Sequence, residues 1–433
     1  MSLQPDMPAS PRRAVFTSLG VISPVGDTPT FWANLLAGTP GVRAVRAFDP
    51  SALPCRIAGE TLEPFDAKKY IPSSNKDGRK SLKNMAKTVQ LGLCGAQLAM
   101  DDGGPAKGTI DPFRFGIEFG CVMVASELED LSAAAKHTIT ADSRKIDMAK
   151  WGHEGVEKIT PLWMLKYLPN MPACHTSIFF DSQGPNNTIT AGDVASTLAL
   201  GEAFRLLQRD AADYFLVGGC DSKINPLSFT RNNLFVPFTR NNDHPATAVR
   251  PFDKDRDGTA LGEAAALFGL EDLEHAKKRG AKVYAELAGF ASGFDRGRKG
   301  PILAGVIRNA LKEAGITPAD VDHVNTSAGG LPELDAFEAR AIHEVFGTVT
   351  PVYALKGQIG NTGAASGAIE LAASILALKH GQLPGTVNHA ATSADCPVTV
   401  HVGEPRPVTK PYAVKINYTD LGQCAVAVVK KFE

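Results

Sequence analysis

The apolar positions of the chain alternate between short runs typical of strands and longer patterns typical of helices. Residues 14–26 predict a strand that runs into a turn, and residues 81–100 place apolar side chains along one side of a long helix. Residues 194–208 carry apolar side chains around the whole circumference, as a helix inside a domain requires. The strand pattern of residues 214–217 follows and ends in two glycines. This alternation predicts an α/β fold with a mostly parallel sheet between helices.

The rest of the chain extends this alternation. Residues 282–289 repeat the strand-and-glycine pattern of residues 15–26, which indicates an internal duplication. We therefore expect two similar halves, residues 12–270 and 271–433. Residues 136–158 are polar and predict surface, and a tight polar turn is predicted at Gly184. Further elements are expected as a helix at 30–37 and strands at 56–59, 115–125 and from 267.

Composition excludes several classes of protein. The 433 residues carry a net charge of −1, which argues against a nucleic-acid binder that relies on overall basicity. No window reaches the apolar length of a membrane span, and the polar first dozen residues lack the core of a signal peptide. The seven cysteines form no C-x-x-C pair and are expected as reduced, mostly buried thiols. We expect a cytoplasmic protein without a metal or cofactor.

Three motifs resemble the β-ketoacyl-acyl carrier protein synthases. Gly184-Pro185-Asn186 with Thr188-Ile189, and the later Gly218-Gly219, are similar to the nucleophile region of that family. The loop from Arg250 to Gly258, followed by Leu261-Gly-Glu263, resembles the loop that follows the nucleophile almost letter for letter. The resemblance implies that residues 163–180 contain a dimer-side loop before the turn at Gly184. It also implies the thiolase fold, a layered αβαβα core built from two pseudo-repeated halves.

The residues that carry the family's chemistry are replaced in this resemblance. Aligned without a gap, the cysteine nucleophile falls on Asp193. The two histidines that activate the malonyl donor fall on Ser327, in Val324-Asn-Thr-Ser327, and on Asn361, in Gly360-Asn361-Thr362. A carboxylate, a hydroxyl and an amide thus stand where acyl transfer and decarboxylative condensation need a thiolate and two imidazoles.

Asp193 has two interpretations that the sequence leaves open. An aspartate at the start of a helix is a favoured N-cap, because its oxygen accepts from free backbone N–H groups. Alternatively, Asp193 and Asp420 face one buried cleft as a general acid and a general base. Asp420 falls at or beside the family's gating phenylalanine in the C-terminal loop, which also contains Cys424.

Three other residues are expected to support the pocket. Lys356 and Glu338 match family counterparts, and a lysine–glutamate pair of this kind is more often structural than catalytic. Thr259 follows the Asp-Gly step where the family has a bulky aromatic residue, so one wall of the pocket is expected to differ.

The resemblance implies three functions in order of preference. The first is a chain-length-factor-like protein, without condensing activity, that pairs with an active ketosynthase in fatty acid or polyketide biosynthesis. The second is an enzyme with altered acid–base chemistry on an acyl thioester, and the third is a plain synthase. The expected partners are an identical chain or a ketosynthase subunit, through the strand after Gly184 and the apolar run of residues 178–180. An acyl carrier protein would dock on the basic residues from Lys76 to Lys87, although such a run is more often a solvated face.

Overall fold

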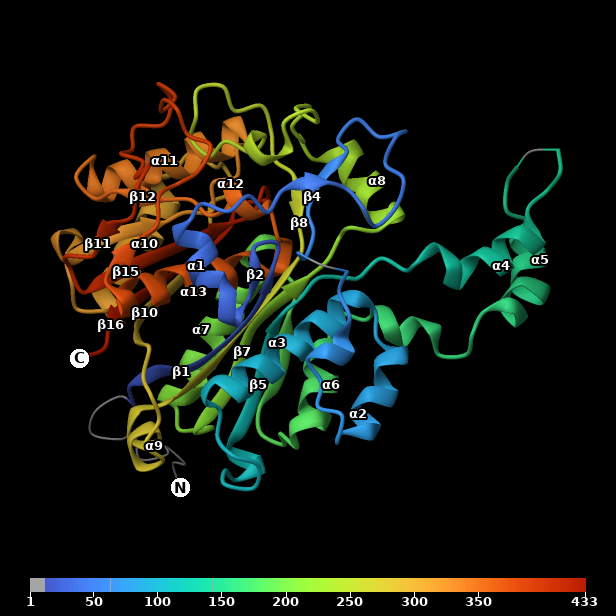
Figure 1. The fold of residues 1–433 in the computed structure, drawn as a ribbon, viewed down its shortest axis with the longest axis horizontal. Coiled ribbons are helices and arrows are strands. Elements are labelled where there is room, and N and C mark those ends of the chain that lie inside the picture. The colour runs from blue at the N-terminus through green and yellow to red at the C-terminus, as the bar shows by residue number, and fades with distance from the viewer. Residues whose placement is uncertain (1–11, 63, 143) are drawn as a thin grey trace, which may run out of the picture.

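The computed structural model describes residues 12–62, 64–142 and 144–433, and one large mixed sheet runs through it (Figure 1). Among these residues the sheet has eleven strands in the order β12-β11-β15-β16-β10-β1-β9-β7-β5-β6, with β2 beside β1. Its strands are β1 (Ala14–Ser23), β2 (Gly26–Asp27), β5 (Phe115–Gly120), β6 (Asn186–Ile189), β7 (Tyr214–Asp221), β9 (Ala264–Asp272), β10 (Ala285–Phe294), β11 (Val321–Asn325), β12 (Val352–Tyr353), β15 (Tyr412–Tyr418) and β16 (Gln423–Lys431).

The two ends of this sheet repeat the same topology. The sequence of strands β1-β9-β7-β5-β6 corresponds to β10-β16-β15-β11-β12, with the same parallel or antiparallel sense at each step. The register even shifts at the same place, between Phe16 and Ser18 in β1 and between Leu287 and Gly289 in β10. The predicted duplication is therefore present in the topology. The exact boundary between the halves stays a prediction, and position 270 falls within β9.

The sheet is mixed rather than mostly parallel, so that part of the prediction is wrong. β9 and β16 run antiparallel to both of their neighbours, whereas β5 and β11 run parallel to theirs. In each half, the last strand along the chain pairs antiparallel with the first one. The sequence did not predict this, because local apolar patterns do not encode strand direction.

The helices form three layers around the two halves of the sheet. Helix α3 (Lys87–Gly103) packs on β1 and β9, and α10 (Pro301–Glu313) packs on β10 and β16. Helices α7 (Ala195–Gln208) and α13 (Ser366–His380) contact each other and strands of both halves. This arrangement is the expected αβαβα core, with α7 and α13 as its central layer.

The central helices approach closely because small residues line their contact. A Cβ atom added to Gly367 of α13 would lie 2.0 Å from the Oγ1 atom of Thr197 in α7. Nearly all of α13 is buried, as is one broad side of α7. The sequence correctly predicted α7 as an interior helix.

Several predicted elements have different bounds. The single helix expected at 81–100 is broken into α2 (Lys76–Ser81), a short 3-10 turn and α3, because the backbone of Ala86 is extended. Residues 171–180 form helix α6 (Met171–Phe180) instead of a loop, and the polar turn expected after Gly184 is strand β6. The strand expected at 115–125 ends at Gly120, while the helix expected at 30–37 is α1 (Thr28–Leu36) and the strand at 56–59 is β4 (Ile57–Gly59).

The region expected as plain polar surface is a helical arm. Helices α4 (Leu128–Thr138) and α5 (Met148–Lys150) extend away from the rest of the molecule in Figure 1. The arm exposes large apolar side chains, among them Met148 and Leu162, which are 71% and 76% exposed.

The remaining elements complete the outer layers. They are β3 (Arg43–Ala44), β8 (Leu261–Gly262), α8 (Pro226–Phe235), α9 (Leu273–Lys278), α11 (Pro332–Phe346), α12 (Lys356–Ile359), β13 (Gln382–Leu383) and β14 (Arg406–Pro407). In the described part of the chain, no helix has the length and apolar character that crossing a membrane requires. The seven cysteines are unpaired, and all except the partly exposed Cys174 are buried, as predicted.

Candidate functional site

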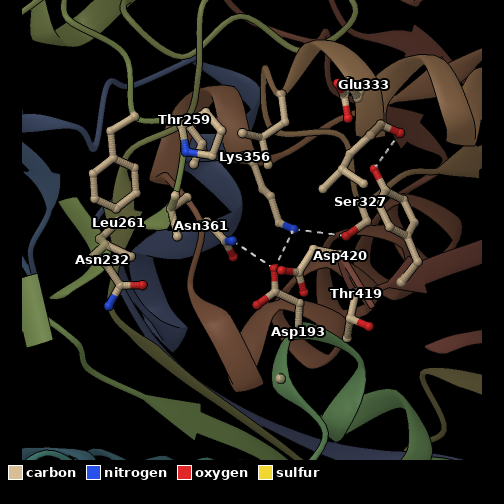
Figure 2. A pocket seen from close by; sticks show the side chains of 18 of the residues that line it. Asp193, Asn232, Thr259, Leu261, Ser327, Glu333, Lys356, Asn361, Thr419 and Asp420 are labelled. Carbon is tan, nitrogen blue, oxygen red and sulfur yellow. Dashed lines mark hydrogen bonds and ion pairs between the residues drawn. The ribbon is translucent and has the colours of Figure 1, made fainter. Parts of the chain in front are cut away.

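A cavity of about 660 Å³ lies where the central helices begin, and most of the predicted site residues line it (Figure 2). Its floor is polar, and one wall is apolar, formed by residues 235–238 with Leu261, Leu331 and Leu334. Of the residues singled out from the sequence, Asp193, Thr259, Ser327, Lys356, Asn361 and Asp420 contribute to its lining. Residues far apart in the chain thus meet at one concave site that combines apolar and polar surface, as ligand pockets usually do.

Asp193 is not the N-cap of the helix, so the capping interpretation is wrong. Helical winding begins one turn before α7, in the 3-10 turn Gly192–Val194, and the N-cap positions of the two segments are Ala191 and Val194. No side chain caps either segment. Because Asp193 lies inside the turn, its carboxylate is directed into the cavity, where Figure 2 shows it facing Lys356 and Asn361.

The Asp193 carboxylate is held by two side chains from the other half of the sequence. Asn361 Nδ2 donates to Asp193 Oδ2 at 2.7 Å, and Lys356 Nζ lies 3.7 Å from the same oxygen. Asn361 cannot rotate freely, because its Oδ1 accepts from the backbone N–H of Gly363 and from the hydroxyl of Ser366. Both contacts to Asp193 use Oδ2, so Oδ1 remains available to a bound molecule.

Lys356 connects Asp193 with Ser327. Its Nζ donates to Ser327 Oγ at 2.9 Å and lies 3.8 Å from Glu370 Oε1. Burial disfavours the charged lysine, but the carboxylates of Glu370 and Asp193 outweigh this effect, so the pKa of Lys356 is raised above its ordinary value. Lys356 is therefore an ammonium group at the floor of the cavity.

The hydroxyl proton of Ser327 points away from its two donors. Ser327 Oγ accepts from Lys356 Nζ and, at 3.3 Å, from Asn417 Nδ2. A serine hydroxyl has two acceptor positions and one donor, so with both acceptor positions occupied only its proton remains to bond. Because Ser327 lines the cavity, this proton is available to an acceptor bound there.

The comparisons with known proteins agree with this architecture. The family model described as the beta-ketoacyl synthase N-terminal domain matches residues 12–276, and the model of the C-terminal domain matches residues 284–390. This chain belongs to the beta-ketoacyl synthase family. The two matches fall on the two halves of the sheet, and they include the cavity-floor residues Asp193, Ser327, Lys356 and Asn361.

Individual relatives include a 3-oxoacyl-[acyl-carrier-protein] synthase and structures of ketosynthases. The 3-oxoacyl-[acyl-carrier-protein] synthase 2 of Synechocystis is 30% identical over 98% of this chain and 99% of its own length. The ishigamide ketosynthase/chain length factor structure is 25% identical, with a TM-score of 0.84 over 98% of this chain and 100% of its own. The structure of AntDE:AntF, a type II polyketide synthase acyl-carrier protein in complex with its ketosynthase, is 25% identical with a TM-score of 0.82 over the same shares.

Lys356 does not pair with Glu338, in contrast to the expected lysine–glutamate pair. Within the described residues, the carboxylates in contact with Lys356 are those of Asp193 and Glu370. Glu338 lies behind Ser327 and accepts from its backbone N–H at 2.8 Å. Burial raises the pKa of Glu338 to about 8, so this side chain positions Ser327 with little net charge at neutral pH.

The other expected support residues divide into two groups. Thr259 is buried at the cavity wall, and Asp420 is exposed at the cavity, so both line it. Cys424 does not line the cavity, because it lies in β16 and its side chain is buried in an apolar cluster. The alternation of side chains along a strand places Cys424 on the side of α10.

Two lysines of the site were missed at the level of sequence. Lys223 Nζ lies 3.4 Å from Asp221 Oδ2. Burial acts to lower the pKa of Lys223, but the negative charges of Asp221 and Asp193 raise it above its ordinary value. Lys415 is completely buried in β15. The available signal was a lysine inside an apolar strand pattern, Ala413-Val-Lys-Ile416, since lysine is rarely buried without a paired charge.

The basic segment expected to dock a carrier protein is only partly free. Lys76, Lys80 and Lys83 are exposed, whereas Lys87 forms an ion pair with buried Glu263 and Arg79 donates to backbone carbonyls. Three lysines remain on the surface of α2 and the following turn, and carrier-protein docking there stays a prediction.

Proposed function

We propose that this chain is a ketosynthase-like subunit that does not condense substrates by itself and acts beside an active ketosynthase in fatty acid or polyketide biosynthesis. The observation that carries the proposal is the Asp193 carboxylate, bound by Asn361 and Lys356 at the position that the resemblance assigns to the cysteine. A carboxylate is a poor substitute for a thiolate in accepting an acyl group. None of the described cysteines lines the cavity.

The partners in this proposal follow from the relatives and from the surface of the chain. The ishigamide ketosynthase/chain length factor and the AntDE:AntF complex support a ketosynthase subunit and an acyl carrier protein as partners. Within the described residues, strand β6 is an unpaired edge of the sheet, and the arm that carries α4 and α5 exposes apolar side chains. Both features suit a subunit interface. The location that accompanies this role is the cytoplasm.

The direct test is a condensation assay with the purified protein alone. With malonyl-acyl carrier protein and an acyl-acyl carrier protein as the two substrates, we expect no more β-ketoacyl product than in a reaction without this protein. Asp193→Asn keeps the shape of the side chain and serves as the matched variant. Condensation at ordinary enzyme turnover that is lost in Asp193→Asn would overturn the proposal.

A second candidate function is acid–base chemistry on an acyl thioester, and the hydroxyl proton of Ser327 favours it. A carbonyl oxygen bound at Ser327 would accept this proton in a hydrogen bond. Asp193 Oδ1 would then act as the base that removes a proton from the α-carbon, and Asp420 at the exposed side would exchange that proton with water. A proton that comes from water then returns to the same carbon, so only this C–H bond breaks and re-forms and no nucleophile is needed.

Deuterium exchange separates the two candidates. Acetoacetyl-pantetheine in deuterated buffer would exchange its α-protons faster with the protein than without it, and Asp193→Asn would abolish the difference. Equal exchange rates with and without protein would exclude the second candidate and leave the non-condensing subunit role intact.

A further inference from the structure

Lys415 lies in a closed cage of oxygen atoms behind the cavity. Its Nζ donates to three backbone carbonyls, those of Asn325 at 3.2 Å, Thr326 at 2.9 Å and Ile416 at 2.6 Å. The same nitrogen lies 2.7 Å from Glu370 Oε2, and both side chains are completely buried. Burial lowers the pKa of Lys415 below its ordinary value, but four oxygens around one nitrogen leave no place for the lone pair of a neutral amine, so the group in this cage is an ammonium ion.

Buried charges of opposite sign alternate from this cage to the cavity. Lys415 pairs with Glu370, Glu370 lies 3.8 Å from Lys356, and Lys356 lies 3.7 Å from Asp193. Two ammonium groups thus face two carboxylates. Breaking one member of such a buried set leaves an uncompensated charge, which the nearest opposite charge then approaches.

Glu370 is shared unequally between its two lysines. Oε2 binds Lys415 at 2.7 Å and accepts from Asn417 Nδ2 at 3.1 Å, whereas Oε1 has only the long contact to Lys356 and no hydrogen bond. Lys356 Nζ instead donates its short hydrogen bond to Ser327 Oγ. The close lysine therefore satisfies Glu370 and leaves the second lysine directed toward the cavity.

We propose that Lys415 is a positioning residue, which by neutralising Glu370 keeps the ammonium group of Lys356 on Ser327 and Asp193. Without Lys415, Glu370 is the strongest unpaired charge within reach of Lys356, and it would draw that ammonium away from the cavity floor. The proposal concerns how the site is held, and it stands whether or not the pocket carries out either reaction considered above.

The first test is the structure of Lys415→Met, which keeps the length of the side chain and removes its charge. We expect Lys356 Nζ to move into hydrogen-bond distance of Glu370 and out of contact with Asp193. In Lys415→Met/Glu370→Gln, no carboxylate competes, so Lys356 should return to Asp193 and Ser327. If Lys356 keeps its contacts to Asp193 and Ser327 in Lys415→Met, the proposal is wrong.

A cycle of melting temperatures tests the same coupling in solution. Asp193→Asn should lower the melting temperature of the wild-type chain, but it should have little effect in the Lys415→Met background, where Lys356 has already left. Its effect should reappear when Glu370→Gln is added. Residues without contact or shared partners normally give additive effects, so loss of additivity here identifies Lys356 as the link.

The matched control is Lys312→Met, which removes an exposed lysine in the last turn of α10. The effect of Asp193→Asn should be the same in that background as in the wild type. Additive effects of Asp193→Asn and Lys415→Met would overturn the proposal and assign Lys415 to packing alone. If Lys415→Met does not fold, Glu370→Gln alone decides: Lys356 should approach Asp193 in that variant, and movement toward the introduced amide would contradict the proposal.

Discussion

At the scale of single residues, the site depends on buried carboxyl groups whose surroundings set their charge. Asp335 accepts from the backbone N–H groups of Phe252, Gly329 and Gly330, and burial nevertheless raises its pKa to about 6. Glu338 is positioned similarly, with a pKa raised to about 8 by burial. Both groups hold the loop that presents Ser327, and both bind protons more tightly in the folded chain than in the unfolded one.

The substitution Glu338→Gln should weaken the pH dependence of stability. Because the folded-state pKa lies above the ordinary value of 4.5, stability is greatest below that value and falls as pH rises toward about 8. Between those limits the wild-type chain should lose on the order of a few kcal/mol. Glu338→Gln keeps the acceptor for Ser327 N–H and removes the titration, so its free energy of unfolding should fall less.

Denaturant unfolding at pH 5, 6.5 and 8 measures this difference. The part of the decrease that comes from Asp335 should remain in Glu338→Gln, mainly below pH 6. An identical pH dependence in the two proteins would show that Glu338 is ionised throughout and that its burial does not control its charge.

At the scale of elements, the contact of α7 with α13 determines where the cavity floor lies. α7 follows the turn that carries Asp193, and α13 follows the segment that carries Asn361, so the spacing of the two helices sets the distance between these side chains. Gly367 permits that spacing, since its position meets Thr197 and Asn417 at once. Close packing of two interior helices gives little room to relax.

Two glycine substitutions test this contact against an internal control. Gly367→Ala should destabilise the fold by about 1–3 kcal/mol, because the added methyl group overlaps Thr197. Gly305, inside α10, has no atom within 4 Å of an added Cβ, so Gly305→Ala should stabilise the fold by about 0.5–1 kcal/mol through helix propensity. Thermal or denaturant unfolding measures both. Similar values for the two variants would contradict a tight contact between the central helices.

At the scale of the whole molecule, one edge of the sheet combines an unpaired strand with exposed apolar groups and unsatisfied polar groups. β6 ends the sheet, and buried polar atoms without a hydrogen bond, including Glu118 Oε2 and Thr188 Oγ1, lie on or beside it. Ile178 on neighbouring α6 is 75% exposed. A second chain that pairs with β6 would cover the apolar groups and provide partners for the polar ones.

We predict that the chain forms a dimer through this edge, which light scattering at micromolar concentration measures as a mass of two chains. Ile178→Asp should shift the mass toward one chain by placing a charge in the interface. Leu227→Asp in α8 alters another exposed apolar side chain, 47% exposed, and should leave the mass unchanged. A wild-type mass of one chain would contradict the homodimer, and equal effects of both variants would contradict an interface at β6.

The sequence by itself determined the types of most elements, the duplicated halves and the family. These properties depend on local periodicity and on motifs of adjacent residues, such as the apolar circumference of α7 and the loop from Arg250 to Gly258. The positions of Asp193, Ser327, Lys356 and Asn361 at one site also followed from motifs. Each of these inferences needs only short-range order or direct comparison of letters.

Tertiary structure decided strand direction, the extended arm and the contacts of the site. Asp193 had the sequence of a helix cap, but an early 3-10 turn placed it inside the winding, and its partner Asn361 lies 168 residues away. Lys415 is an ordinary surface residue type, and only the pairing of β15 with β11 and β16 surrounds it with carbonyls and Glu370. Charges and hydrogen bonds act through space over a few ångströms, so their partners are fixed only when distant segments pack together.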